Sequence, residues 1–290
     1  MSIATFFEAL YGSDELPEGA YIELWSKDGG ALYVRDFSEA EACASTIRGN
    51  AYYGVCLAPP TGVDHRADAQ SVMYAPALWA DIDVLSPHHS KQNLPGSENE
   101  AYNTLMESLP LAPSCIVSTG GGIHAYWFLD ELYSLADDAD RVRFAGIIKG
   151  WQGMLRKAMR KRAWALDATH DLARIMRIPG TYNANAGVQS AISFLDESLR
   201  YTLDDFGQYT DIDISMTEAE SLLQYSKEFR HIQIVPRQGY SNREPLCSRV
   251  HLLCDIVEQV RTSYSCSNHA LASDSRYTLD SSLGYWLARY

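Results

Sequence analysis

The most constraining feature of this sequence is an apolar run, residues 77–84, that ends in two closely spaced carboxylates, Asp81 and Asp83. The run has the composition of a β-strand, and alternate side chains of a strand point to the same face. Asp81 and Asp83 therefore lie side by side, while Ile82 points to the opposite face. Adjacent carboxylates repel each other unless a cation neutralises them, and their oxygens suit hard divalent metals. The sequence thus predicts a strand that carries a metal site.

An Asp-x-Asp pair also occurs as ordinary surface decoration, so the spacing alone does not establish a metal site. Asp211 and Asp213 have the same spacing without any supporting motif nearby. The first pair is distinguished by the motifs that follow it in the chain.

A chain of 290 residues is long enough for about two domains. We expect the first at residues 1–200. From about residue 201 the pattern changes to short helical and turn-like pieces, which predicts a small, mainly helical domain at 201–290. The closing residues, 283–290, resemble an element that is cut short and suggest a piece of a longer protein.

The composition is that of a soluble globular protein, with 46% apolar and 21% charged residues. The first ten residues lack the basic segment of a secretory signal, and no uncharged apolar run reaches the ~18 residues of a membrane helix. The six cysteines do not form a disulfide framework. We therefore expect a cytoplasmic protein without membrane contact, in the host cytoplasm if a phage encodes it.

The charge is unevenly distributed along the chain. A formal net charge of −13 argues against a nucleic-acid partner, but residues 141–177 carry ten Lys and Arg against two acidic residues, which is +8. A basic band on an acidic body is expected of a protein that binds a phosphate backbone or a triphosphate. The alternative is that these basic residues simply form the solvent-exposed face of a helix and bind no ligand.

Apolar periodicity and turn signals predict a mixed α/β fold. Ser38 and Glu41 are placed to form a capping box at the start of one helix, and Ser97 is a suitable N-cap for another. The expected helices are a short one within residues 1–16, then 38–48, 97–108 and 137–166. The expected strands are residues 21–25, 31–35, 51–58, 77–84, 114–118, 123–129 and 188–195.

A second motif, Ser118-Thr-Gly-Gly-Gly-Ile-His124, joins two of these strands. Gly120, Gly121 and Gly122 allow the backbone to approach a ligand closely and to direct N–H groups at phosphate oxygens. It is neither a Walker loop nor a dinucleotide fingerprint. His124 begins the outgoing strand, within reach of such a ligand. The alternative is a tight hairpin followed by a core histidine.

A third motif lies in residues 166–181. Arg174 and Arg177 are three residues apart, so a helical turn would place them on one side. Asp167 could add a third carboxylate. Three acids, two arginines, a histidine and a glycine turn are the parts of a two-metal nucleotidyl-transfer site. The alternative for the arginines is structural ion pairing with Asp167 and Asp171.

In this order the three motifs resemble those of the archaeo-eukaryotic primase superfamily, and within it the primase-polymerases of phages and plasmids. The third motif is Asp167 followed by Arg174-x-x-Arg177-x-Pro-Gly-Thr181. Each motif is loose by itself, while their order and spacing together are more specific. The resemblance covers about residues 1–200.

The resemblance implies an RRM-like catalytic core with an N-terminal α/β subdomain. It implies that Asp81, Asp83 and Asp167 are catalytic and bind two Mg or Mn ions, with Asp171 as the alternative third ligand. The residues expected to bind the nucleotide include the glycine turn and are Ser118, Gly120, Gly121, Gly122, His124, Arg174 and Arg177.

The C-terminal part contains a further group of metal-type residues, Cys247, Cys254, Cys266 and His269, with His251 between the first two. They could hold zinc, although the spacing is not that of a standard finger, and a helical core is the alternative. Proteins similar to this one often continue with a small helical primase-associated domain and a helicase, so a helicase domain or partner is a further expectation.

The leading hypothesis is a template-directed nucleotidyltransferase of DNA replication, a DNA primase or polymerase that uses nucleoside triphosphates and copies single-stranded DNA. A second hypothesis is a non-catalytic replication-initiation or primase-accessory DNA-binding protein. A sugar-nucleotide transferase is a third, against which the arginine pair and the Pro-Gly-Thr sequence argue. The sequence leaves open whether the primers are RNA or DNA.

Overall fold

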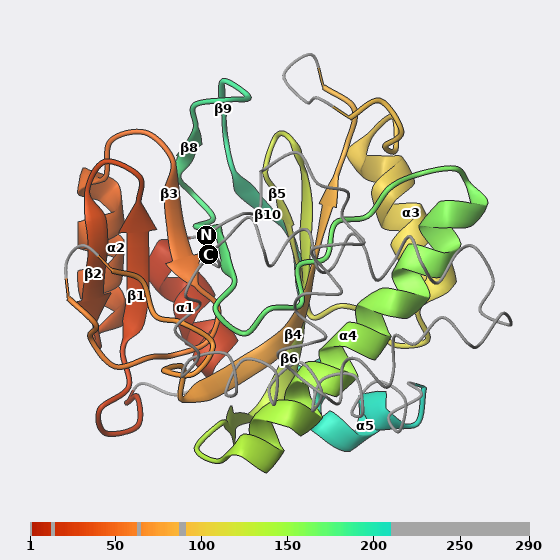
Figure 1. Cartoon of the computed structure of the whole chain (residues 1–290). Coiled ribbons are helices and arrows are strands. Elements are labelled where there is room, and N and C mark those ends of the chain that lie inside the picture. The colour runs from red at the N-terminus through yellow and green to blue at the C-terminus, as the bar shows by residue number, and fades with distance from the viewer. Residues whose placement is uncertain (1, 13–14, 63–64, 87–90, 210–290) are drawn as a thin grey trace, which may run out of the picture. The chain divides into compact units, whose positions relative to one another are not determined.

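A computed structural model describes residues 2–12, 15–62, 65–86 and 91–209 (Figure 1). The chain divides into two compact units, Met1–His231 and Ile232–Tyr290, and every described residue belongs to the first. Most of the predicted 201–290 domain therefore lies outside the described residues, as do all four zinc candidates, Cys247, Cys254, Cys266 and His269.

The described residues form a mixed α/β fold with mainly antiparallel sheets. The elements in chain order are α1 (Ile3–Tyr11), β1 (Ile22–Ser26), β2 (Gly30–Val34), α2 (Phe37–Thr46), β3 (Ala51–Gly54), β4 (Tyr74–Asp83), α3 (Glu98–Ser108), β5 (Cys115–Ser118), β6 (Gly122–Ser134), α4 (Asp138–Lys161), β7 (Ile175–Arg177), β8 (Tyr182–Asn183), β9 (Val188–Gln189), β10 (Ala191–Leu195), β11 (Arg200–Tyr201) and α5 (Leu203–Gly207).

The N-terminal sheet has the strand order β2-β1-β3-β7. The two strands expected at 21–25 and 31–35 are confirmed and form a hairpin, in which Ser26 pairs with Gly30 and the Ser26 hydroxyl accepts the N–H of Gly29 at 3.0 Å. The fourth strand, β7, comes from much later in the chain and pairs antiparallel with β3, with Tyr52 opposite Arg177. Part of the third motif thus belongs to the N-terminal sheet.

The second sheet has the order β10-β5-β6-β11, and β4 pairs along the other edge of β6. The pairing of β4 with β6 is antiparallel and places Asp81 opposite His124 and Asp83 opposite Gly122. On its other side, β6 pairs with β5, so the two predicted strands before and after the glycine turn form the hairpin that was the alternative interpretation of this motif.

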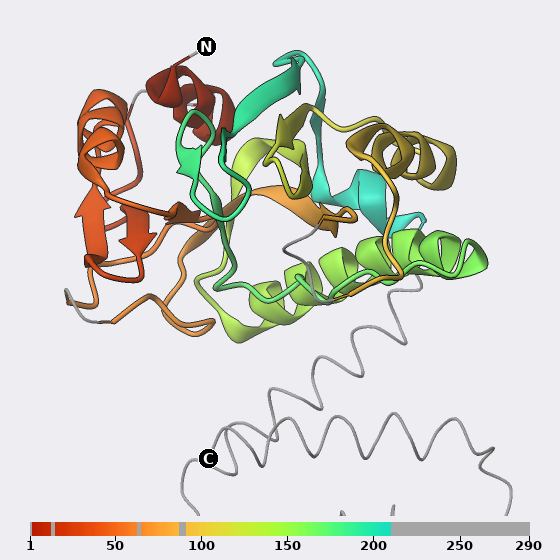
Figure 2. The same cartoon turned by 90° about the horizontal axis from the view of Figure 1, so that it is seen from above.

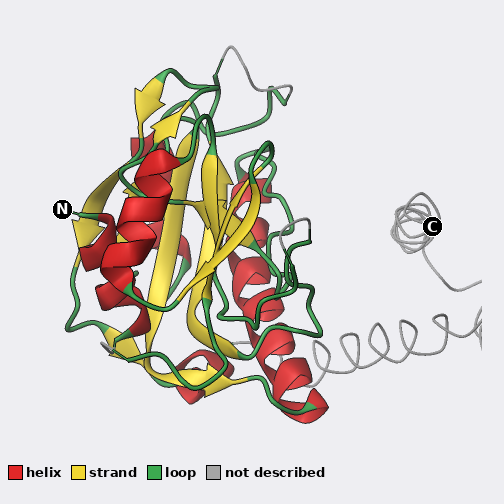
Figure 3. Ribbon diagram, turned by 90° about the vertical axis from the view of Figure 1, so that its left-hand side faces the viewer, coloured by secondary structure: helices red, strands yellow, loops and turns green. Residues whose placement is uncertain are grey.

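Helices α3 and α4 follow β4 and β6, and α4 lies along one face of the second sheet (Figures 1 and 3). Ser97 caps α3, as predicted, and Asp137 caps α4. Helix α4 ends at Lys161, earlier than expected, because Ala163 adopts a left-handed conformation with φ of 59°. Within the described residues, no helix is long and apolar enough to cross a bilayer.

The predicted capping box of α2 is wrong. The N-cap is Asp36, whose carboxylate accepts the N–H of Glu39 at 2.7 Å. Glu41 instead accepts the N–H of Ala4 at 3.2 Å and so ties α2 to α1. The helix therefore starts one residue before Ser38, because an acidic acceptor already satisfies its first turn.

Two further expectations for residues 167–195 are wrong. The stretch that ends at Arg177 is the extended strand β7, so Arg174 and Arg177 do not share a helical turn. The expected strand 188–195 is broken at Ser190 into β9 and β10. The hydroxyl of Ser190 lies 2.9 Å from the carbonyl oxygens of Ile178 and Thr181, which turns the chain there.

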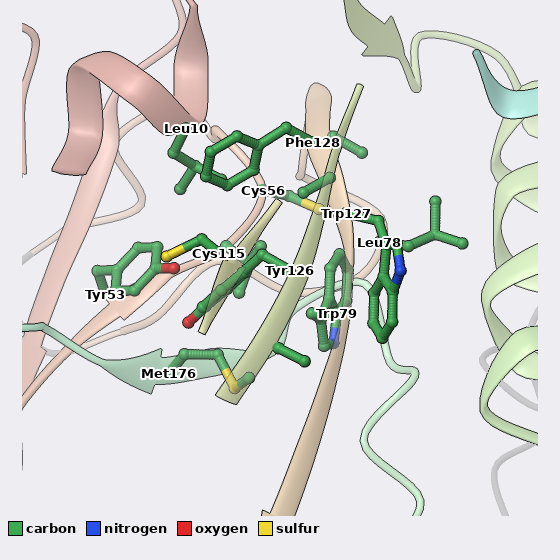
Figure 4. Close-up of a cluster of buried hydrophobic side chains, with 14 of the residues drawn as sticks. Leu10, Tyr53, Cys56, Leu78, Trp79, Cys115, Tyr126, Trp127, Phe128 and Met176 are labelled. Atoms are coloured by element: carbon green, nitrogen blue, oxygen red, sulfur yellow. The ribbon is translucent and has the colours of Figure 1, made fainter. Parts of the chain in front are cut away.

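The core joins the two sheets through α1. The ring of Phe6 lies 5.6 Å from the ring of Tyr53 on β3 and 5.8 Å from that of Tyr126 on β6. Figure 4 shows Tyr53, Tyr126 and Trp79 in this cluster of buried side chains. Burial of one such large side chain contributes about 1.5–3 kcal/mol. The two sheets therefore keep their relation largely through apolar packing around α1.

Candidate active site

The two sheets meet at a polar pocket of about 250 Å³. It is lined by Tyr52, Asp81, Asp83, Ser86, Thr119, Gly121, His124, Arg177, Asn183, Asn185 and Ala186. The wall from the second sheet carries the acidic and histidine side chains, and the wall from the N-terminal sheet carries Tyr52 and Arg177. Residues of all three sequence motifs thus line one pocket.

Asp81 and Asp83 lie on the same face of β4, and Ile82 between them is fully buried on the other face. Antiparallel pairing sets Asp81 directly opposite His124, where side chains lie on the same side of the sheet. The distance from His124 Nε2 to Asp81 Oδ1 is 3.6 Å. The strand register therefore unites the first and second motifs without any help from loops.

His124 is a buried histidine with only 6% exposure. Burial lowers the pKa of His124 to about 3, and Arg177 and Arg174 act in the same direction, while Asp83 opposes them. The imidazole is therefore neutral at pH 7, and its contact with Asp81 is not an ion pair there. Its Nδ1 lies 3.5 Å from the hydroxyl of Tyr126, which supports the ring from the core side.

Arg177 is held rigidly at the opposite wall. Its guanidinium donates to Asn50 Oδ1 at 3.1 Å and to the Tyr52 hydroxyl at 3.4 Å, and it lies 5.1 Å from the centre of the Tyr52 ring. Burial lowers the pKa of Arg177, whereas Tyr52 and Asp81 raise it. An arginine remains protonated under these conditions. Arg177 is thus a fixed positive charge that faces the acidic wall.

Arg174 lies just before β7 and is not among the residues that line the pocket. Its Nη2 donates to Asp171 Oδ2 at 2.5 Å and to the carbonyl of Ala168 at 3.3 Å. Arg174 therefore forms the structural ion pair that was the alternative to nucleotide binding. Its charge nevertheless lies near enough to His124 to lower the pKa of that histidine.

The three glycines have different environments. A Cβ on Gly122 would lie 2.1 Å from the carbonyl oxygen of Ile82, so only glycine allows β6 to lie this close to β4. Gly120 has φ of +78°, and a Cβ there would lie 2.2 Å from Val188 Cγ2. Gly121 lines the pocket and would place a Cβ in open space. Two glycines therefore shape the turn, and one leaves room for a ligand.

Ser118 and Asp167 are not among the residues that line the pocket. The Ser118 hydroxyl donates to Glu98 Oε1 at 2.8 Å, toward α3. Asp167 forms an ion pair with Lys91, and 52% of its side chain is exposed. The nucleotide contact of Ser118 and the metal contact of Asp167 therefore remain predictions. Asp171 is not a better third metal ligand than Asp167, because it forms an ion pair with Arg174.

The donors that are present suit a hard divalent ion. In the described part of the chain, no group of three or more His, Cys, Asp or Glu is arranged to hold a metal. Asp81 and Asp83, however, line the same open polar pocket. One or two carboxylates, completed by water and substrate phosphates, are the usual protein share of a Mg²⁺ site. The pocket therefore fits Mg or Mn when a phosphate ligand is bound with it.

Several pocket residues escaped prediction from the sequence. The β8–β9 hairpin, which Figures 1 and 2 show between the N-terminal sheet and β5, supplies Asn183 and Asn185. Asn183 Nδ2 donates to the carbonyl of Thr119 at 2.7 Å, and its Oδ1 accepts the N–H of Asn185 at 3.1 Å. Closely spaced asparagines favour local turns, so the sequence could have predicted the turn that carries Asn183 and Asn185. Nothing in the sequence around Tyr52 indicated that this side chain lines the pocket.

No protein-family model matches this sequence, and no curated protein matches it either. Among solved structures, the chain is similar to the AEP domain of the primase-polymerase (PrimPol) of cyanophage S-2L, with 16% sequence identity and a TM-score of 0.46. The match covers 71% of this chain and 96% of that one. Values this low do not by themselves assign a fold or a function.

Proposed function

We propose that this chain is a template-directed nucleotidyltransferase of DNA replication, a DNA primase or polymerase that uses nucleoside triphosphates, single-stranded DNA and two Mg or Mn ions. The observation that carries the proposal is the register of β4 and β6. It places Asp81 and Asp83 beside His124, and Arg177 lines the same pocket from the other sheet. The order of the three motifs along the chain supports the same assignment.

The element order supports an RRM-like core within this proposal. The series β4, α3, β5, β6 and α4 is strand-helix-strand-strand-helix, the first five elements of a split β-α-β arrangement. The preceding N-terminal sheet then corresponds to the α/β subdomain, and residues 1–200 to the catalytic domain.

Each pocket side chain has a role in the proposal. Asp81 and Asp83 would hold the divalent ions, which would neutralise the triphosphate and lower the pKa of the attacking 3′-hydroxyl. Arg177 offers a planar fork of donors to phosphate oxygens. Neutral His124 can donate one hydrogen bond to the same ligand without carrying a charge. Gly121 leaves the space that the phosphates occupy.

Nucleotide incorporation on single-stranded DNA tests the proposal, with Mg or Mn and with or without a primer. The chain should form products that depend on the metal. The Asp81→Asn/Asp83→Asn variant should form none, because an amide cannot replace a charged ligand, while the exposed Asp130→Asn control keeps full activity. Products without a primer would add primase activity. Equal activity of all three proteins would contradict the metal assignment.

One observation favours a second candidate, a non-catalytic replication-initiation or primase-accessory protein. Asp167, the expected third carboxylate, pairs with Lys91 outside the lining of the pocket. A protein of this kind would bind DNA but incorporate no nucleotide with either metal. The incorporation assay, run beside a DNA-binding assay, separates the two candidates.

A further inference from the structure

Three polar nitrogen atoms near the end of α4 are buried without a hydrogen-bond partner. They are Nη2 of Arg156, Nδ1 of His170 and Nε of Arg174. Native proteins pair nearly all buried polar groups, with protein, water or a bound ion. Three unpaired nitrogens, of which two belong to cations, therefore indicate a missing acceptor.

One face of α4 brings these groups together. Lys149, Gln152 and Arg156 follow each other at spacings of three and four residues, so they share a face of the helix. Gln152 Oε1 accepts the N–H of Thr169 at 3.2 Å, and Trp79 Nε1 donates to the carbonyl of Thr169 at 2.6 Å. The segment that contains His170 is thereby fastened to the face that carries Arg156.

Arg174 closes the cluster from the other end of the segment, since its guanidinium donates to the carbonyl of Ala168. Burial lowers the pKa of His170 to about 4, and Arg156, Lys149 and Arg174 lower it further, against Asp171. These cations therefore surround one neutral imidazole.

The acids near the cluster are already paired. Asp171 forms its ion pair with Arg174, and Asp167 forms one with Lys91. Asp167 also raises the pKa of Arg156, but within the described residues the hydrogen bond of Arg156 goes from Nε to the carbonyl of Leu166 at 3.5 Å and not to a carboxylate. The cluster consequently keeps cationic hydrogen-bond donors without an acceptor, which is the chemistry of a phosphate site.

We propose that Arg156, His170 and Arg174 bind one backbone phosphate of the DNA strand. The cluster adjoins the exposed basic end of α4, which continues with Lys157, Arg160 and Lys161. The guanidinium of Arg174, whose side chain is 27% exposed, acts electrostatically on both His124 in the pocket and His170 in the cluster. The strand assignment rests on the proposed function, whereas the phosphate chemistry does not.

The triphosphate of a free nucleotide offers the same chemistry as the strand. We favour the strand because basic side chains continue from the cluster along the exposed end of α4, and none of them is among the residues that line the pocket. A nucleotide would instead be expected to place its phosphates between Asp81 and Arg177. Separate titrations with a strand and with dATP distinguish the two sources.

The test is the affinity of a fluorescent oligothymidylate, measured by anisotropy over a series of salt concentrations without metal. The Arg156→Gln variant should lose one phosphate contact. The slope of log affinity against log salt should then fall by about 0.7, with about fivefold weaker binding near 0.1 M salt. The matched control is Lys27→Gln, which removes the same charge from an exposed position in the β1–β2 turn, outside the proposed path of the strand. We expect it to change both quantities much less.

His170→Phe keeps a ring of similar size but has no nitrogen, and it should also weaken binding. It carries the test if Arg156→Gln does not fold, as judged by thermal unfolding. A slope for Arg156→Gln equal to that of Lys27→Gln, or an unchanged affinity of His170→Phe, would overturn the proposal, and an effect on dATP alone would overturn its assignment to the strand. An inactive polymerase that still shows the slope change would contradict the proposed function but not the phosphate site.

Discussion

The glycine turn offers a sharp test of the site geometry, because its three glycines should respond differently to the same substitution. Gly122→Ala places a methyl group 2.1 Å from the carbonyl oxygen of Ile82 and 2.9 Å from the Cα of Asp83. These are backbone atoms of β4 and cannot rotate away. The strand that carries the acidic pair must therefore move from its partner.

The magnitude follows from the contacts. Overpacking against backbone costs about 1–3 kcal/mol or more, so Gly122→Ala should lower the free energy of unfolding by about 3 kcal/mol. For a unit of this size, that is roughly 6–12 °C in Tm. Gly120→Ala combines a left-handed residue with a contact to a side chain and should cost about 1–2 kcal/mol. Gly121→Ala meets nothing within 4 Å and should cost less than about 0.5 kcal/mol.

Thermal and denaturant unfolding of the three variants measure these differences directly. Nucleotide incorporation measured beside them should fall steeply for Gly122→Ala, because Asp81 and Asp83 lose their place opposite β6. Gly121→Val should unfold like the parent yet bind nucleotide more weakly, since its side chain enters the pocket. If Gly122→Ala were as stable and active as Gly121→Ala, the close approach of β4 and β6 would be refuted.

Three further predictions concern the core, the pocket and pH. Phe6→Ala should lower the free energy of unfolding by about 3–5 kcal/mol, because this ring joins both sheets, and denaturant unfolding should show little change for the more exposed Phe194→Ala. Arg177→Lys should weaken nucleotide binding about tenfold or more, since an ammonium cannot make the paired contacts of the guanidinium, and it should also lower Tm because the buried contacts with Asn50 and Tyr52 are lost; equal affinity would exclude a phosphate contact. Burial raises the pKa of Glu23 above 4.5, although the N–H of Ala67 hydrogen-bonds its carboxylate. The folded state therefore favours the protonated form, and the stability cost of the charge is absent below pH 4.5 and develops as pH rises through the raised pKa. Glu23→Gln should accordingly gain in Tm over the parent at pH 7 and not at pH 4, and a gain at pH 4 alone would contradict this sign.

Much of the local structure could be predicted, because it depends on neighbours in the sequence. Strand alternation alone put Asp81 and Asp83 on one face, and the two apolar runs around the glycine turn predicted the strands β5 and β6, with their hairpin as the alternative interpretation of the turn. Side chains near a helix start predicted the Ser97 cap, although the same argument failed at Ser38, where Asp36 is the cap. Local rules identify the kind of element more reliably than its first residue.

The arginine motif shows where local reasoning stops. Spacing alone suggested a helical turn, whereas Ile175–Arg177 is drawn into the N-terminal sheet by pairing with β3. That pairing sends Arg177 to the pocket and leaves Arg174 beside Asp171. A strand partner so far away in sequence is chosen by packing of the whole domain, which no local spacing encodes.

The sequence by itself determined the chemistry available to this protein: two carboxylates on one strand face, a glycine turn, a histidine after it and a basic band. Only the tertiary structure decided which of these groups meet. It placed Asp81 opposite His124, brought Tyr52 and Arg177 from the other sheet, and left Asp167 with Lys91. The physical reason is that composition and periodicity act over a few residues, while strand register and sheet packing are set by burial of the shared core.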